Sequence, residues 1–271
     1  MKNTKVFFPL AFALIFASSS CKKNELTPTG TNSTSTFSTY LQNTTINNAS
    51  ELGCLDFSCI GISDGGTTNN YTHFYGAIFT NPLDSGGNYM DVGTISISNS
   101  NGSFSKSHSN VPPYFQTNIS GKSSLFGSSA TVFFPGNSSL GIDTFSNNFY
   151  LPLPVMITSS TSSSISSSSS YQINWNTDAN NQNGIVIGIY YSSMLNRIID
   201  STMQTTDKLW TVTTTDNGSY TIPSAVLSTF PQGSHIDIYV GRAAATPYLI
   251  GNSKSINLFS SSYSKLSKKL N

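Results

Sequence analysis

Charged side chains are scarce in this chain. Only 9% of its 271 residues are Asp, Glu, Lys or Arg, against about 25% in a typical soluble domain. The 13 basic and 12 acidic residues nearly cancel, so the sequence offers no electrostatic basis for binding nucleic acid. The surface must instead be wetted by the hydroxyl and amide groups of its many Ser, Thr and Asn residues, a composition that agrees with export from the cytoplasm.

Histidine is also rare, which argues against a metal site. His73, His108 and His235 lie far apart, and none has a second ligand nearby at metal-binding spacing. The twelve acidic residues are scattered singly and offer no carboxylate pair of the glycosidase type. We therefore expect no metal, no cofactor and no enzymatic activity.

One sequence string matches a catalytic motif. Gly61–Gly65 (GISDG) fits the G-x-S-x-G nucleophile elbow, which would expose Ser63 at a strand-to-helix turn. The residues that follow, GTTNN, are a poor helix start, so we interpret the string as a glycine turn. A hydrolase using Ser63 is the remaining alternative, and it would need a histidine within hydrogen-bonding reach of that serine.

The first 21 residues predict a lipid anchor. Lys2 and Lys5 precede a short apolar run, Val6–Ala17, and small residues separate this run from Cys21. The run is too short to span a hydrocarbon core. This order resembles a bacterial lipoprotein precursor, with a signal peptide over residues 1–20 and lipid on Cys21. Ser18 stands where the lipoprotein motif usually has Leu, so an ordinary signal peptide or an uncleaved anchor are the alternatives.

Cys54 and Cys59 are the remaining cysteines. In an oxidising compartment an isolated pair usually forms a disulfide, and we expect one here. Five residues of straight strand would separate the Cα atoms by about 16 Å, whereas a disulfide needs about 4.4 to 6.8 Å. The bridge therefore requires a turn or bulge between them, and two free thiols are the alternative.

The rest of the chain predicts an all-β fold after a flexible stalk. Residues 21–50 are polar and have few large apolar side chains, too few to offset the entropy of ordering. Beyond them, apolar residues alternate with polar ones, or form short continuous runs, between Gly-containing turns. The predicted strands lie at 93–98, 130–134, 171–175, 185–191, 210–213 and 235–240.

The loop at 178–184 superficially resembles a calcium loop, but its Asn-Gly pair favours a hairpin. A short helix is expected at Ser224–Phe230, begun by Ser224 and ended by Pro231. The apolar residues at 194–199 have helical spacing, but they cover less than two turns, so we assign no secondary structure to that segment.

Two β-sandwich domains are expected, at residues 51–151 and 152–262, followed by a basic tail at 263–271. The second domain should begin with a strand at Val155–Ile157, and its serine-rich tract, Ser159–Ser170, should be a loop. The alternative makes this tract the linker between the domains. About seven strand candidates in the C-terminal part favour an immunoglobulin-like or fibronectin type III-like sandwich that buries Trp175.

The chain resembles lipoproteins of the Bacteroidota. The resemblance lies in the CKKNE start at Cys21 and in the order of the segments GTISISNS, INW, NGSYTIP and IDIYVGR. It implies a lipid-anchored envelope protein, in the outer membrane, and it brings no enzymatic activity. Acidic residues after the cysteine favour export to the outer face in these proteins. Glu25 is the one acid here, so the surface and the periplasmic face both stay open.

Two function classes follow. The first is a non-enzymatic binding or structural module with an unidentified partner. The second is a carbohydrate-binding accessory lipoprotein whose exposed rings stack on sugars. The candidate ligand-binding aromatics are Tyr71, Tyr75, Tyr89 and Tyr114. Alternation along a strand places at most half of such rings on one face, which favours a core role for them.

Overall fold

The protein has an all-β, sandwich-type fold with few helices. The computed structural model describes residues 50–64, 67–78, 90–108, 114–116, 119, 121–159, 162–251 and 254–271. The predicted signal peptide, Cys21 and nearly all of the predicted stalk lie outside these residues and stay predictions.

Two compact units make up the chain, and each gathers separate segments of it. Of the described residues, unit 1 contains those within 50–60, Thr72–Leu151 and Ala244–Ser260; unit 2 contains those within Gly61–Tyr71, Pro152–Ala243 and Ser261–Asn271. The change at Leu151/Pro152 coincides with the expected domain boundary. The expectation that the domains simply follow one another is wrong, because the last two strands each contribute residues to both units.

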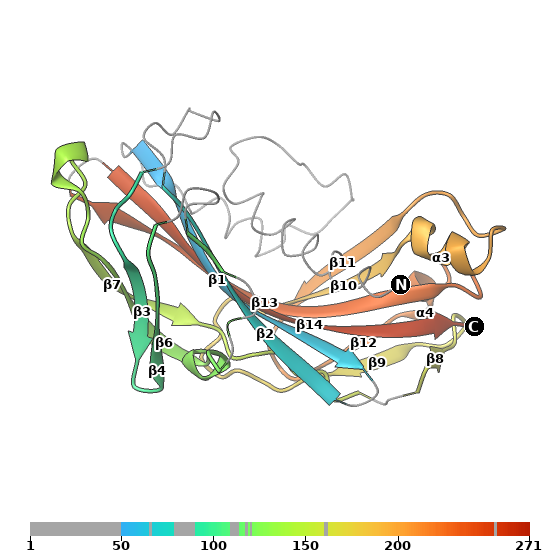
Figure 1. Ribbon diagram of the computed structural model, residues 1–271. Helices are drawn as coiled ribbons and strands as arrows, with labels where there is room; N and C mark the ends of the chain where they lie inside the picture. The colour runs from blue at the N-terminus through green and yellow to red at the C-terminus, as the bar shows by residue number, and fades with distance from the viewer. Residues whose placement is uncertain are drawn as a thin grey trace. The chain divides into compact units, whose positions relative to one another are not determined.

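Unit 1 is built from two layers of strands. One layer has the strand order β13-β14-β1-β2-β5, and the other has the order β4-β3-β6-β7 (Figure 1). The strand bounds are β1 Ser50–Asp64, β2 Thr67–Ile78, β3 Ile95–Asn99, β4 Gly102–Lys106, β5 Tyr114–Gln116, β6 Ser128–Phe134, β7 Phe145–Leu151, β13 His235–Ile250 and β14 Lys254–Leu270. Two 3-10 turns, Ser123–Leu125 and Ser138–Leu140, flank β6.

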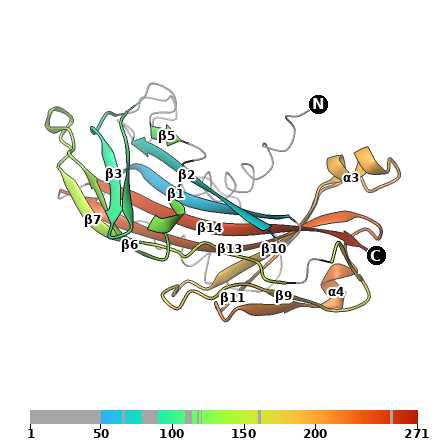
Figure 2. The same cartoon turned by 60° about the horizontal axis from the view of Figure 1, so that its bottom comes forward.

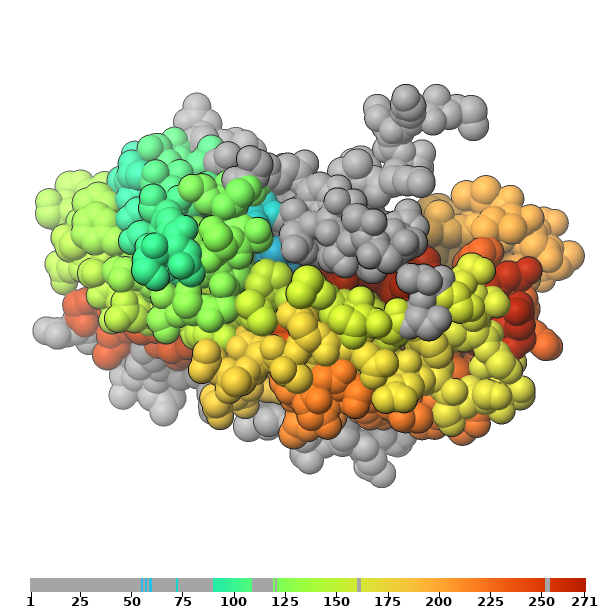
Figure 3. All heavy atoms as spheres, turned by 90° about the horizontal axis from the view of Figure 1, so that it is seen from below, coloured from blue at the N-terminus to red at the C-terminus, as the bar shows by residue number. Residues whose placement is uncertain are grey.

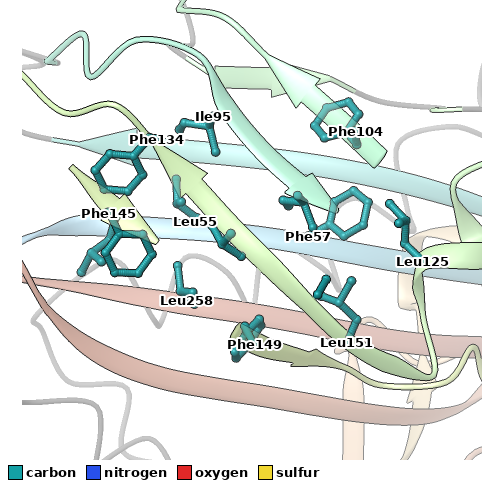
Figure 4. Close-up of a cluster of buried hydrophobic side chains, with 14 of the residues drawn as sticks. Leu55, Phe57, Ile95, Phe104, Leu125, Phe134, Phe145, Phe149, Leu151 and Leu258 are labelled. Carbon is teal, nitrogen blue, oxygen red and sulfur yellow. The ribbon is translucent and has the colours of Figure 1, made fainter. Parts of the chain in front are cut away.

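The core of unit 1 lies between these layers. Figure 4 shows Leu55 and Phe57 of β1 and Leu258 of β14 packing with the side chains of the second sheet. The Phe57 ring stacks on Phe104 and Phe126, with centroids 5.7 and 5.1 Å apart. Strict alternation in β1 buries Leu55, Phe57 and Cys59, so this strand directs one face into the core.

Unit 2 contains strands of two sheets, as expected of a β-sandwich. One sheet has the order β11-β10-β13-β14, with β8 pairing parallel to β14; the other pairs β9 with β12, and Ile157 bridges to Trp175. The additional strand bounds are β8 Ser164–Ile165, β9 Tyr171–Asn174, β10 Ile185–Tyr191, β11 Lys208–Thr214 and β12 Ser219–Ile222. Trp175 is buried between the sheets, as expected.

The described part of unit 2 contains two short helices. The segment that sequence analysis left open forms α3, Ser193–Ile199, and Ser192 caps it by accepting a hydrogen bond from the Leu195 N–H. The expected helix at 224–230 is shorter, because α4 covers Ser224–Leu227. Pro223 rather than Ser224 occupies its N-cap position, and no side-chain hydrogen bond caps it.

The predicted basic tail at 263–271 is wrong, because residues 263–270 belong to β14. Leu266 and Leu270 join the core of unit 2, and Lys268 is buried with its ammonium donating to the Ser162 carbonyl. Burial lowers the pKa of Lys268.

The serine-rich tract belongs within unit 2 and contains β8, which agrees with a loop rather than a linker between domains. The expected strand at Val155–Ile157 is reduced to the single bridge at Ile157.

Candidate functional site

The aromatic residues predicted to bind a ligand are only partly placed. Tyr71 and Tyr75 lie on β2 and Tyr114 lies on β5, but their side chains and the whole of Tyr89 lie outside what the structure describes. The β2–β5 register pairs Gly76 with Tyr114, so Tyr75 and Tyr114 occupy neighbouring positions. Tyr71 belongs to unit 2, whereas Tyr75 and Tyr114 belong to unit 1. A glycan-binding face on these residues stays a prediction.

The expected Cys54–Cys59 disulfide is wrong. Both cysteines lie on β1, which runs without interruption from Ser50 to Asp64, and Cys59 is free and buried. A continuous strand supplies neither the turn nor the bulge that would bring the two Cα atoms within bonding distance. Burial raises the pKa of the Cys59 thiol to about 12, opposed by a hydrogen bond with Thr72. Cys59 is therefore a core residue.

We expect the Cys59 thiol to resist alkylation in the native protein at pH 8, because it is buried and remains protonated far below its pKa of about 12. It should react once urea unfolds the chain. Mass spectrometry of peptides from the alkylated, unreduced protein measures whether each cysteine has reacted. A peptide linked through Cys54 and Cys59 would contradict this assignment.

The G-x-S-x-G string does not form a nucleophile elbow. Ser63 lies near the end of β1, and the next element is β2 rather than a helix. The elbow geometry requires a strand followed by a helix, so the predicted turn between strands agrees with the observed order. His235 begins β13, where its backbone N–H donates to Asn196. No group of three metal-ligating side chains occurs among the described residues.

Unit 2 contains a buried ion pair that sequence analysis missed. The side chains of Arg242 on β13 and Asp216 after β11 are each at most 2% exposed, and Nε of Arg242 lies 2.5 Å from Oδ2 of Asp216. Nη2 of Arg242 donates to Oδ1 of Asp216 at 3.1 Å, which makes the pair bidentate. Twenty-six positions separate these residues, so no local spacing could have identified them.

Both the guanidinium and the carboxylate of this ion pair make further hydrogen bonds. Arg242 also donates to the backbone carbonyls of Leu153 and Asn176. Asp216 accepts hydrogen bonds from Trp175 Nε1 at 2.8 Å and Asn181 Nδ2 at 2.9 Å.

Burial alone would raise the pKa of the Asp216 carboxyl, but the hydrogen bonds from Arg242, Asn181 and Trp175 outweigh it and hold the pKa below its usual range. Because their hydrogen-bonding groups are occupied within the protein, Asp216 and Arg242 have a structural role.

The expected hairpin at 178–184 is wrong, because this loop joins β9 of one sheet to β10 of the other. The Asp178 carboxylate accepts backbone hydrogen bonds from Leu153 and Asn180, and the Asn181 amide donates to the Gly184 carbonyl. Gly184 adopts a φ of +74°, and a Cβ there would meet the Thr214 carbonyl oxygen at 2.5 Å. The polar side chains of this loop are thus engaged within the protein.

The segment between β10 and β11 carries α3 and is held at several points. The amide of buried Asn196 donates to the carbonyls of Ser192 and His235 and accepts the His235 N–H. The Tyr191 hydroxyl donates to the Gln204 carbonyl at 2.9 Å. These bonds fix both the helix and the chain after it to the sheet.

Asp207 ties the end of this segment to its beginning. Its carboxylate accepts hydrogen bonds from Ser193 N and Oγ at 2.8 and 2.6 Å, and from the Tyr190 hydroxyl at 2.5 Å. The hydrogen bonds from Ser193 and Tyr190 lower the pKa of Asp207, while burial and the Asp207 charge raise the pKa of Tyr190 to about 12. The loop is therefore a rigid platform.

This platform displays apolar side chains to solvent. Four exposed residues of α3 form what we call the apolar α3 surface: Met194 (60% exposed), Leu195 (39%), Ile198 (75%) and Ile199 (67%). Figure 1 and Figure 2 show α3 outside the sheet, and in Figure 3 its light-orange segment forms a raised part of the surface. A helical apolar face normally packs on a core, whereas here the polar Asn196 is the buried residue.

A shallow hollow adjoins this surface within unit 2. Ile199 and Met203 line it together with the polar side chains of Asn196, Asp200, His235 and Lys269. The sequence signal for the site was the helical spacing at 194–199. That signal predicts an apolar face but not whether the face is buried.

Fold and site together define an all-β sandwich protein with a rigid, apolar surface loop. No known protein-family model matches the chain, and no curated protein sequence matches it. No helix in the described part of the chain is long and apolar enough to cross a membrane.

Proposed function

We propose that this chain is a lipid-anchored, non-enzymatic protein of the cell envelope, held in the outer membrane through Cys21, and that it acts as a binding module. The observation that carries the proposal is the apolar α3 surface on a loop fixed by Asn196 and Asp207. A surface of this kind on an otherwise polar protein is typical of an interaction site.

The ionisable groups of unit 2 support a role other than catalysis. Asp216 and Arg242 are saturated by internal hydrogen bonds, and Asp207 is occupied by Ser193 and Tyr190. A catalytic acid or base must instead be able to reach a substrate proton. The perturbed pKa values of Asp216 and Asp207 are thus accounted for by structural contacts.

Metabolic labelling with a fatty-acid analogue tests the anchor. We expect the wild-type chain to incorporate the label and to sediment with membranes, whereas Cys21→Ser should lose the label and become soluble. Cys59→Ala is the matched control, because it removes a cysteine that lies in the core and should leave labelling unchanged. Labelled Cys21→Ser protein would exclude lipid attachment at this position.

A further inference from the structure

The apolar α3 surface is too small for a stable protein partner. Its four side chains expose about a few hundred Å² at most, whereas a stable interface buries about 800 Å² on each partner. Strong binding to a second copy of the chain or to another protein would need further apolar surface next to it. The adjoining hollow supplies mostly polar groups, including Asp200, His235 and Lys269.

A small apolar surface is sufficient for a partner to which the chain is already tied. If Cys21 carries lipid, 29 residues separate the membrane from Ser50, and they span at most about 100 Å whatever their conformation. The tether keeps the local concentration of bilayer high, so a weak additional contact becomes populated. This step rests on the proposed lipid anchor.

The charges around α3 are compatible with lipid headgroups. Arg197 is exposed in the last turn of α3, and exposed Lys269 lines the adjoining hollow. Asp200 lies beside them and Asp207 stands at the base of the loop, while Lys208 donates to the Thr229 carbonyl. The cations exceed the acids by only one, so apolar insertion rather than charge should dominate the contact.

We propose that the apolar α3 surface is a membrane-contact site. Ile198 and Ile199 enter the boundary between headgroups and acyl chains, with Met194 and Leu195 beside them, and Arg197 remains at headgroup level. The hydrogen bonds of Asn196 and Asp207 already hold the helix in place, so the loop loses little conformational entropy when it contacts the bilayer. Unit 2 would then rest against the bilayer in a defined orientation.

Vesicle binding of the mature chain with Cys21→Ser tests this inference without the lipid anchor. The probe is vesicles of phosphatidylethanolamine and phosphatidylglycerol, and co-sedimentation gives the partition coefficient. We expect measurable binding that falls by about tenfold or more for Ile198→Glu with Ile199→Glu, because burial of a large aliphatic side chain contributes at least that factor. Met156→Glu is the matched control, since Met156 is exposed to 44% in the same unit and should bind as the parent does.

Each other outcome overturns the inference. Absence of vesicle binding, or equal loss in the Met156→Glu control, would exclude a contact specific to α3. A dimer in gel filtration that dissociates in the Ile198→Glu, Ile199→Glu variant, without vesicle binding, would assign the surface to a second copy of the chain. Fatty-acid labelling tests lipid attachment at Cys21, and vesicle binding tests the α3 contact. Failure of one proposal can therefore be distinguished from failure of the other.

Discussion

Replacing Arg242 by methionine is expected to destabilise unit 2 by about 3–5 kcal/mol, because it leaves the Asp216 carboxylate buried without its counter-charge. It also leaves the carbonyls of Leu153 and Asn176 without these donors. Urea denaturation followed by tryptophan fluorescence measures the loss in the correct unit, because Trp175 and Trp210 both belong to unit 2.

The more exposed ion pair of unit 2 provides the control. Lys265 lies 3.1 Å from Asp237, with the two side chains exposed to 21 and 17%. Lys265→Met should cost about 1 kcal/mol or less, since exposed ion pairs contribute little. Equal losses for Arg242→Met and Lys265→Met would contradict the role assigned to the buried pair.

The buried pair also has a signature in its pH dependence. The folded-state pKa of Asp216 is lowered, so its contribution to stability is present above the unfolded pKa of about 3.9 and is lost as pH falls through the folded value. The stability difference between wild type and Asp216→Asn should therefore shrink below about pH 4. A difference that stays constant down to pH 2 would contradict the assignment.

Replacing Phe57 by alanine is expected to destabilise unit 1 by about 3–5 kcal/mol. Phe57 is 2% exposed and its ring stacks on both Phe104 and Phe126, so the substitution removes aromatic contacts and opens a cavity. Far-UV circular dichroism in urea measures the loss.

Phe133→Ala is the matched control, because Phe133 on β6 is exposed to 39%. It should cost about 1 kcal/mol or less. Similar effects of the two substitutions would contradict the assignment of Phe57 to the core.

Alternation and short apolar runs in the sequence predicted β3, β6, β9, β10, β11 and the first part of β13, but not the other strands. Ile185–Tyr191 forms the central strand β10, and residues 93–98 correspond closely to β3. The Asn-Gly pair at 183–184 likewise marked a turn, where positive φ requires glycine.

The extent of β14 could not be predicted from hydropathy. Its buried positions include Ser260, Ser262 and Ser264, which look like surface residues in a sequence. Two of them are accommodated by backbone hydrogen bonds, since Ser260 Oγ donates to the Phe57 carbonyl and Ser262 Oγ accepts the Val155 N–H. Small hydroxyl side chains can therefore be buried at little cost, and a polar tail became a strand.

The sequence predicted only part of the candidate site. The apolar spacing at 194–199 indicated a helix, but such spacing normally marks a buried face. Asn196 holds the helix to β13 through bonds to His235, 39 positions away. Long-range polar contacts of this kind, like the Asp216–Arg242 pair, leave no local pattern.

Photo-cross-linking from position 198 in intact cells tests the central claim most directly. A photoreactive phenylalanine analogue at Ile198 of the otherwise wild-type chain should form adducts with phospholipid, identified by mass, while the same analogue at Met156 should not. Phospholipid adducts confined to position 198 would agree with an anchored protein that rests on the bilayer through α3. Adducts with a protein partner, or no lipid adduct at position 198, would contradict it.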